Sequence, residues 1–200
     1  MTALVVVAHP DSESLTHHLG RSISTALTDI GVDTGWADLH AEKFDPRFTL
    51  ADRRLYQGNG PIPADVAAEQ QRLNDIDDLV LVFPVYWWSM PALLKGWIDR
   101  VFINGWAFDD HVTPIARKLG HLTIHLVMPA GDDADSFQRR GYDTAISTQI
   151  ETGVLGYCGA RTGFTTVLHE AEALTLAGLE EKGRAVGAAV ADAVRRPIGV

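Results

Sequence analysis

Residues 79–102 read Leu-Val-Leu-Val-Phe-Pro-Val-Tyr-Trp-Trp-Ser-Met-Pro-Ala-Leu-Leu-Lys-Gly-Trp-Ile-Asp-Arg-Val-Phe, and this stretch decides the fold. Its first part, Leu79–Phe83, is a continuous apolar run of the kind found in strands that are buried on both faces. Its last part, Pro91–Phe102, predicts a helix whose proline lies near the first turn, where proline is tolerated. A buried strand that leads through a loop into a helix is the repeating unit of a parallel sheet.

The same unit recurs on both sides of this stretch. Further strands are predicted at Leu4–Ala8, Val32–Ala37, Leu119–Met128 and Gly163–Leu168. Further helices are predicted at Glu13–Ile30, Ala64–Leu73, Asp135–Leu155 and Leu174–Val194. Ser12 is the expected N-cap of the first helix, and Gly31 ends it. The segment Asp38–Gly60 is polar and irregular, so no element is predicted there.

Five strands that alternate with helices predict a parallel sheet with right-handed crossovers and helices on both faces. We expect an α/β fold, doubly wound in the flavodoxin-like order 2-1-3-4-5, with residues 1–200 forming one domain. In such sheets a ligand binds at the carboxyl ends of the strands, at the switch point between strands one and three. The candidate site residues are therefore those that follow each strand.

Composition and charge narrow the classes of partner. The chain has a formal net charge of −9 and a pI near 5.2, which disfavours nucleic acid and anionic membranes as partners. Its single cysteine, Cys158, allows no disulfide within the chain and fits a reducing cytosol. The N-terminal apolar run is too short for a signal peptide or a membrane span. We expect a cytoplasmic protein without membrane insertion.

Two pairs of histidines and the cysteine have interpretations that involve no catalytic or metal-binding role. His121 and His125 are four residues apart on a predicted strand, with no carboxylate or cysteine patterned nearby, so no metal site is predicted. His17 and His18 are neighbours on a helix and cannot face each other. Cys158 is expected to be a buried small hydrophobe rather than a nucleophile.

The first candidate site follows strand one. Ser12, Ser14 and Thr16 place three hydroxyls at alternate positions where a helix begins. Free backbone N–H groups and the helix dipole make such a place suitable for an anion, and hydroxyls add donors without charge. Capping by Ser12 or Ser14 is an equally good interpretation of the same residues. Glycine-rich dinucleotide and nucleoside triphosphate motifs do not occur here.

The second and third candidate sites follow strands three and four. Tyr86-Trp87-Trp88 places three aromatic rings at the end of a buried strand, where they can hold a planar heterocycle or pack at a dimer interface. Ala130 and Gly131 follow strand four, and such small residues allow the backbone to approach a ligand closely. An ordinary turn accounts for Ala130 and Gly131 equally well.

These residues resemble a known family. Phe83–Trp88 and Met90–Phe102 are similar to the signature block of the NAD(P)H quinone oxidoreductases, a group that includes the DT-diaphorases and the flavoprotein partners of potassium-efflux systems. His9-Pro10 with Ser14-Leu15-Thr16 resembles the opening block of that family. Asp65–Gln70 and Gly153–Gly159 resemble two further blocks, so the likeness runs from about Leu4 to Gly159.

The resemblance implies a flavodoxin-like flavoenzyme that works as a homodimer with its active site at the subunit interface. It implies ping-pong chemistry, in which NADH or NADPH reduces the flavin and a quinone or similar planar acceptor then takes the hydride from the same place. The Asp38–Pro63 segment looks like that of FAD-binding members, whereas the short C-terminus looks like that of FMN-binding members. We expect FAD, with FMN as the alternative.

The resemblance also assigns roles by position. The phosphate and ribityl end of the flavin would be held by His9, Ser14, Leu15 and Thr16. The ring would be held by Pro84, Val85, Tyr86, Trp87, Trp88, Ala130 and Gly131, with Phe137 aligned to a flavin-site tyrosine of the family. The substrate slot would be walled by Trp87 and Trp88, and by Trp106 and Phe108 from the partner subunit.

The charge on the reduced flavin needs a stabilising partner. The family uses a tyrosine and a histidine downstream of strand four, and here Arg139, Arg140 or Tyr142 would supply that partner. Two other functions fit the same resemblance. One is a flavin-binding regulatory subunit that docks on a potassium-efflux-type membrane transporter, and the other is an electron carrier without enzymatic activity.

Overall fold

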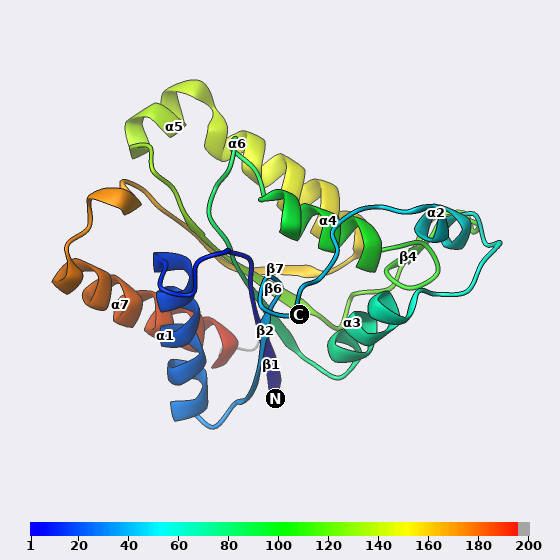
Figure 1. The fold of residues 1–200 in the computed structure, drawn as a ribbon, viewed down its shortest axis with the longest axis horizontal. Coiled ribbons are helices and arrows are strands. Elements are labelled where there is room, and N and C mark those ends of the chain that lie inside the picture. Colours follow the sequence, from blue (N-terminus) through cyan, green and yellow to red (C-terminus); the bar gives the residue numbers. More distant parts are fainter. Residues whose placement is uncertain (196–200) are drawn as a thin grey trace.

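The computed structural model describes residues 1–195 and contains a five-stranded sheet in the order β2-β1-β3-β6-β7 (Figure 1). Its strands are β1 (Thr2–Val7), β2 (Asp33–Asp38), β3 (Asp78–Val82), β6 (Thr123–Pro129) and β7 (Arg161–Leu168). All four neighbouring pairs are parallel. This is the predicted order 2-1-3-4-5, so the prediction of a flavodoxin-like α/β fold is confirmed.

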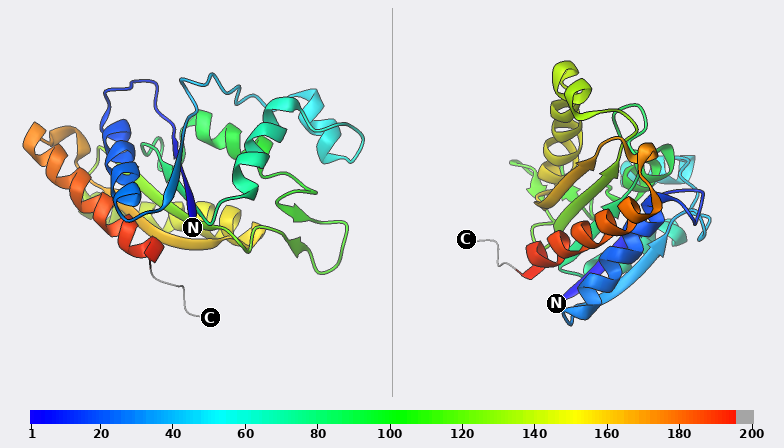
Figure 2. Two further views of the ribbon diagram at one scale, coloured as in Figure 1. Left: turned by 90° about the horizontal axis from the view of Figure 1, so that it is seen from below. Right: turned by 90° about the vertical axis from the view of Figure 1, so that its left-hand side faces the viewer.

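Two apolar layers cover the two faces of the sheet. On one face, α1 (Leu15–Asp29) and α7 (Leu176–Arg195) lie side by side (Figure 2) and pack on alternate residues of the central strands. On the other face, α3 (Ala64–Asn74) and α4 (Ala92–Val101) share a core that includes the fully buried Trp97. β3 and β6 are buried along their whole length, which explains why their sequences are mostly apolar.

The predicted helix Asp135–Leu155 was wrong as a single element. The structure has α5 (Ala134–Arg140), α6 (Tyr142–Ile146) and the π-helix η1 (Ser147–Gly156). Gly141 separates the first two because its φ of 70° lies in the left-handed region, which ends a helix. Figure 1 shows α5 projecting beyond the layer that contains α4 and η1.

Other element boundaries differ from the predictions. The predicted start of strand four at Leu119 was wrong, because a turn with a hydrogen bond from Leu122 N–H to Leu119 O precedes β6. Three short elements were missed: the β4–β5 hairpin (Phe108–Asp109 and Ala116–Arg117), α2 (Leu50–Tyr56) and the 3-10 turn η2 (Ala171–Ala173). None of the helices within residues 1–195 combines the length and apolarity that a membrane span requires.

α2 lies in the segment Asp38–Gly60, for which no element was predicted. A capping box starts it: Thr49 Oγ1 accepts from Asp52 N–H, and the Asp52 carboxylate accepts from Thr49 N–H at 2.7 Å. Before α2 the chain crosses α4 so closely that a Cβ at Gly96 would collide with the Pro46 carbonyl oxygen. This close crossing explains the glycine within α4.

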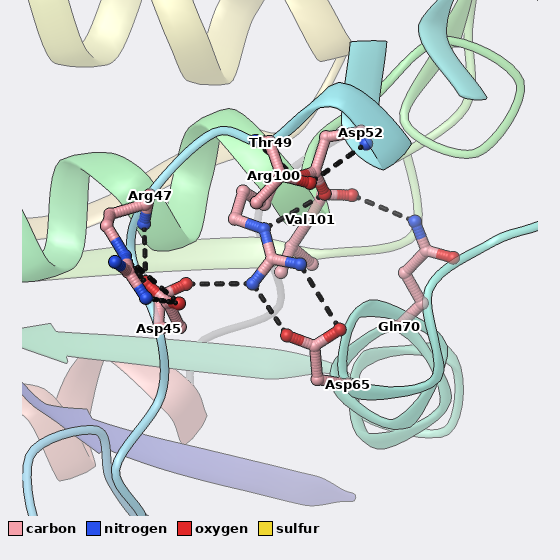
Figure 3. A network of polar contacts seen from close by, with 8 residues as sticks. All are labelled: Asp45, Arg47, Thr49, Asp52, Asp65, Gln70, Arg100 and Val101. Carbon is pink, nitrogen blue, oxygen red and sulfur yellow. Dashed lines mark hydrogen bonds and ion pairs between the residues drawn. The ribbon is translucent and has the colours of Figure 1, made fainter. Parts of the chain in front are cut away.

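Arg100 ties this segment to the sheet-covering helices (Figure 3). From α4, its guanidinium donates to Asp52 on α2 at 2.9 Å, to Asp65 on α3 at 2.6 Å and to the Asp45 carbonyl oxygen at 2.8 Å. Arg100 is buried, and the Asp52 side chain is 0% exposed. A buried cation with three acceptors fixes α2, α3 and α4 relative to one another.

His125 has a structural role that its sequence spacing did not reveal. Its Nε2 lies 3.0 Å from Asp78 Oδ1 across the β3–β6 pair, and its Nδ1 accepts from Phe164 N–H at 2.9 Å. The β6–β7 register shifts at this point, between Ile124 and Leu126. His125 therefore accepts a hydrogen bond from the Phe164 N–H, which lies where the β6–β7 pairing is irregular.

Candidate functional site

The loops that follow β1, β3 and β6 meet at one edge of the sheet, because these three strands are neighbours and parallel. They carry the predicted residues His9–Thr16, Pro84–Trp88 and Ala130–Gly131. This is the edge at which doubly wound sheets bind their ligands.

The loop after β1 is held by its own side chains. His9 Nδ1 accepts from Asp11 N–H at 3.0 Å, and the Asp11 carboxylate accepts from Glu13 N–H at 2.9 Å. Ser14, not Ser12, is the N-cap of α1, since Ser14 Oγ accepts from His17 N–H at 3.4 Å. Leu15 and Thr16 then form the first turn, with backbone N–H groups at the positive end of a helix of 15 residues.

His17 was not predicted as a site residue, yet it lies directly beneath this loop. Its Nε2 is 2.8 Å from Asp38 Oδ2 and its Nδ1 is 3.2 Å from Ser14 Oγ. His18 points elsewhere, with its Nε2 3.1 Å from Leu179 O in α7. The arrangement could have been predicted from Asp38, a polar residue at the end of strand two, because that strand lies next to the first helix.

Trp87 and Trp88 form the centre of a strained turn. Tyr86 N–H donates to Ser89 O at 3.0 Å, and Ser89 N–H donates to Tyr86 O at 3.1 Å. Both tryptophans have positive φ, 49° and 55°, which is the pattern of a type I′ turn. Such turns favour Asn and Gly, and a bulky residue in this region costs about 1–2 kcal/mol. Strain of this kind concentrates at functional sites.

The turn borders a cavity that gathers most of the residues predicted to hold a ring. The cavity has a volume of about 210 Å³, and it is lined by Val85, Trp87, Trp88, Ala130, Gly131, Asp132 and Phe137. Trp87 is 87% exposed at its rim. Because cavities that enclose a whole ligand span roughly 300–1,000 Å³, this one suits one edge of a planar ring whose other parts lie open.

The backbone groups around this cavity are partly used by the protein itself. Val85 N–H donates to Pro129 O and Ala130 N–H donates to Leu168 O, each at 2.8 Å. The first bond joins the loop after β3 to the end of β6, and the second joins the loop after β6 to the end of β7. The donors that remain for a ligand come from Trp87, Trp88 and Gly131 rather than from Ala130.

The residues downstream of strand four pack against the same loop. Tyr142 stacks on Trp88 with ring centroids 4.0 Å apart, and Phe137 meets Tyr142 edge-on at 5.8 Å. The Arg140 guanidinium lies 5.9 Å from the centroid of the Tyr142 ring. Arg139 instead donates to Ser136 Oγ at 3.2 Å. Of the three residues proposed to stabilise charge, Tyr142 and Arg140 are thus joined to the tryptophan turn.

Trp106 and Phe108 lie away from this cavity within one chain. Trp106 Nε1 donates to Asn74 Oδ1 at 3.0 Å, and Phe108 packs edge-on against Tyr157 at 5.0 Å. Phe108 also borders a separate groove of about 480 Å³ between α2, α4 and η1, whose lining includes the half-exposed Phe48 and Tyr56. Cys158 lines it too, and burial raises the pKa of its thiol to about 11, which makes it a poor nucleophile.

The donor set at the sheet edge fits a phosphate-bearing flavin. The N-terminus of α1 and the hydroxyl of Ser14 provide neutral and dipolar groups for the phosphate. The tryptophan turn provides aromatic faces and free backbone groups for the ring. The same edge offers no glycine-rich nucleotide loop that would favour a different ligand.

The comparisons with known proteins agree with this geometry. The sequence pattern of the family described as the flavodoxin-like fold matches residues 1–192. The chain is 32% identical to the uncharacterized NAD(P)H oxidoreductase YcaK of Escherichia coli K12, across 82% of this chain and 81% of that protein.

Two solved structures are similar in fold. The NAD(P)H:quinone oxidoreductase of Methanothermobacter marburgensis superposes with a TM-score of 0.84 at 21% identity, covering 95% of this chain and 98% of that one. General stress protein 14 of Treponema denticola, solved in complex with FMN, superposes with a TM-score of 0.71 at 22% identity, covering 98% of this chain and 100% of that one. The resemblance drawn from the sequence is therefore confirmed: the chain belongs to the family of the flavodoxin-like fold, together with NAD(P)H oxidoreductases.

Proposed function

We propose that this protein is a flavin-dependent NAD(P)H oxidoreductase that passes hydride to quinones or similar planar acceptors by a ping-pong mechanism. The observation that carries the proposal is the strained Trp87–Trp88 turn beside the cavity at the carboxyl edge of the sheet. Two bulky residues are held in a costly conformation there, which is explained if their rings and backbone serve a planar ligand. The names of the relatives support the same reaction class.

The residues of the chain would divide the binding of the flavin between them. His9, Ser14, Leu15 and Thr16 would hold the phosphate and ribityl end at the start of α1. The flavin ring would lie against the loops after β3 and β6. The residues that would contact the ring are Pro84, Val85, Tyr86, Trp87, Trp88, Gly131 and Phe137. Ala130 would act by its small size, since its N–H is already bonded to Leu168 O.

The flavin, when bound, supplies the hydride chemistry, and the protein supplies placement and charge stabilisation. Trp87 and Trp88 would wall the slot in which the nicotinamide and then the acceptor stack. Arg140, Tyr142 or Arg139 would stabilise negative charge on the reduced ring. An open slot of this kind selects planarity rather than the identity of the acceptor.

We further propose that residues 1–200 act as one domain in a cytoplasmic homodimer; residues 196–200 lie outside the described part. The groove of about 480 Å³ supports a dimer, because three of its aromatic side chains, Phe48, Tyr56 and Tyr157, are 40–50% exposed. A partner that covers this groove would also bring Trp106 and Phe108 to the edge of an active site shared between subunits.

A flavin titration tests the proposed site. Full-length protein freed of flavin is titrated with FMN and with FAD, and binding is followed by the quenching of flavin fluorescence. We expect Trp88→Ala to weaken binding of the preferred flavin at least tenfold, while Leu176→Ala, a change of another exposed apolar side chain at the start of α7, leaves it unchanged. Equal affinities for the two variants would contradict the assigned site. FAD is our expected cofactor, and a clear preference for FMN would establish the alternative.

A further inference from the structure

A chain of three polar groups runs beneath the loop after β1. Asp38 at the end of β2 contacts His17 on α1 (Oδ2 to Nε2, 2.8 Å), and His17 contacts Ser14 (Nδ1 to Oγ, 3.2 Å). His17 is 2% exposed, whereas Ser14 is partly open at the N-terminus of the helix. The arrangement connects a buried ionisable ring to the hydroxyl that is proposed to meet the flavin phosphate.

Asp38 fixes which nitrogen of His17 carries a hydrogen. Its second carboxylate oxygen accepts from His40 N–H at 3.1 Å and from Ala41 N–H at 3.0 Å. Burial alone would raise the pKa of Asp38, but the hydrogen bonds from Ala41 and His17 outweigh this effect and lower the pKa. The ionised carboxylate can only accept, so His17 Nε2 carries a hydrogen and donates to it.

In the neutral ring, His17 Nδ1 is then an acceptor. The Ser14 hydroxyl must donate its one hydrogen inward to Nδ1, while its oxygen accepts from His17 N–H. In this state Ser14 has no hydrogen left for a ligand. It can offer only a lone pair, which a phosphate oxygen cannot use.

In the protonated ring, the direction of this bond reverses. Nδ1–H donates to Ser14 Oγ, and the hydroxyl hydrogen of Ser14 is free to turn outward toward an acceptor. The added positive charge lies between Asp38 and the N-terminus of α1, close to where an anion would bind.

The other charged groups near His17 increase the need for this proton. Besides Asp38, the titratable and charged residues of the adjoining segments are Asp11 and Glu13 on the loop, His18 and Arg21 on α1, His40 after β2, and His9, whose ring is 6.4 Å from that of His17. Asp11 and Glu13 put two carboxyl groups on the loop itself, which disfavours a phosphate there. Arg21 donates to Ser12 O at 3.0 Å. The His9 ring lies 6.4 Å from His17, and its Nδ1 accepts from Asp11 N–H at 3.0 Å.

We propose that His17 is a positioning residue that couples the binding of a phosphate-bearing flavin to the uptake of one proton from solvent. The proton binds at Nδ1 and converts the Ser14 hydroxyl from an inward donor into a donor to the phosphate. This inference rests on the proposed flavin site and adds to it a proton linkage and a requirement for the phosphate group.

Isothermal titration calorimetry tests the linkage directly. Full-length protein freed of flavin is titrated near pH 7.5, above the second phosphate pKa of about 6, in two buffers of different ionisation enthalpy. The probes are FMN, FAD and riboflavin, which has no phosphate. We expect uptake approaching one proton with FMN and FAD and none with riboflavin. The Kd for FMN should weaken up to tenfold for each unit of rising pH.

Two histidine variants provide a matched pair. His17→Gln removes the titrating ring, so proton uptake and the pH dependence of the Kd for FMN should both disappear. His18→Gln changes the neighbouring ring, which contacts Leu179 O of α7 and not Asp38 or Ser14, and should behave as the unaltered protein does. In ¹⁵N spectra of the unaltered protein, His17 Nδ1 should be unprotonated without flavin and protonated with FMN.

Three results would overturn the inference. FMN that binds without proton uptake would remove the linkage, and equal uptake with FMN and riboflavin would remove the role of the phosphate. A His17 Nδ1 that stays unprotonated with FMN bound would remove the mechanism. If none of the three flavins binds at any pH, the proposed function fails as well, so the two failures are distinguishable. The calorimetry and spectra of the unaltered protein decide the question if His17→Gln does not fold.

Discussion

The indole of Trp88 and the phenol ring of Tyr142 are stacked, with centroids 4.0 Å apart and an angle of 26° between their planes. The two residues come from different connections of the sheet, one after β3 and one after α5. Their contact joins the tryptophan turn to the segment that was predicted to supply charge stabilisation. Substitutions at Tyr142 therefore separate a role of its stacked ring from a role of its hydroxyl.

We predict that Tyr142→Phe keeps the stability of the protein and Tyr142→Ala lowers it by about 0.5–1.5 kcal/mol beyond the loss of buried area. The reason is that phenylalanine keeps the stacked ring. Urea unfolding measures the stabilities, and the rate of flavin reduction by NAD(P)H measures the role of the hydroxyl. A Tyr142→Phe protein that is stable but reduces its flavin at least tenfold more slowly would show that the hydroxyl itself takes part.

The strain at Trp87 gives a second prediction. Glycine adopts positive φ without cost, and Trp87 is 87% exposed, so it contributes little packing. Trp87→Gly should therefore be about 1 kcal/mol more stable than Trp87→Ala, which removes the same indole but keeps the strained backbone. Thermal unfolding of the two variants without flavin makes the comparison. Equal stabilities would mean that the turn relaxes when the indole is lost.

The Arg100 contacts predict a large loss of stability. Arg100→Ala leaves the buried carboxylate of Asp52 without its cation, and breaking such a pair costs about 3–5 kcal/mol. Lys95→Ala is the control, because the exposed Lys95–Asp99 pair on the same helix is worth at most about 0.5 kcal/mol. Urea unfolding at neutral pH measures both. A loss below 1 kcal/mol for Arg100→Ala would show that the segment containing α2 is held by other contacts.

The same contacts set a pH dependence. Burial would raise the pKa of Asp52, but its hydrogen bonds with Thr49 and Arg100 outweigh burial and lower the pKa. A carboxyl with a lowered pKa stabilises the folded state above its ordinary pKa of about 3.9, and this contribution is lost as the pH falls further. The free energy of unfolding should therefore fall more steeply below pH 5 in the unaltered protein than in Asp52→Asn. Parallel curves would contradict this.

The groove between α2, α4 and η1 predicts an effect on assembly. Phe48→Asp places a charge among the exposed aromatic side chains of the groove and should shift the protein from dimer to monomer. Leu176→Asp is the control, since Leu176 is 83% exposed on α7 and does not line the groove. Sedimentation velocity reports the masses. A Phe48→Asp protein that remains a dimer would place the subunit contact elsewhere.

The sequence predicted the sheet because its central strands are buried on both faces, so β1 and β3 contain the unbroken apolar runs 3–7 and 79–82, and β6 contains the run 126–128 after His125. It missed α2, whose starting signal, Thr49 with Asp52, lies within a polar segment that is held in place by Arg100 from a distant helix. The spacing of apolar residues along the chain carries no information about contacts between residues that are so far apart in the sequence.

The candidate site, too, could be predicted from the sequence only in part. The tryptophans of the loop after β3 were found from their residue types, but their left-handed backbone could not be, because tryptophan disfavours that conformation. The contact between His17 and Asp38 joins residues 21 positions apart and depends on how α1 packs beside β2. Arg139 and Arg140 were equivalent in the sequence, and packing separates them by turning only Arg140 toward Tyr142.

The central claim is that a bound flavin accepts hydride from NAD(P)H in this protein. The visible spectrum of the purified protein, recorded before and after anaerobic addition of NADH or NADPH, tests it most directly. We predict flavin absorption bands that bleach within seconds and return when a quinone is added. A colourless protein that takes up neither FMN nor FAD, or a bound flavin that neither nucleotide reduces, would contradict the proposed oxidoreductase.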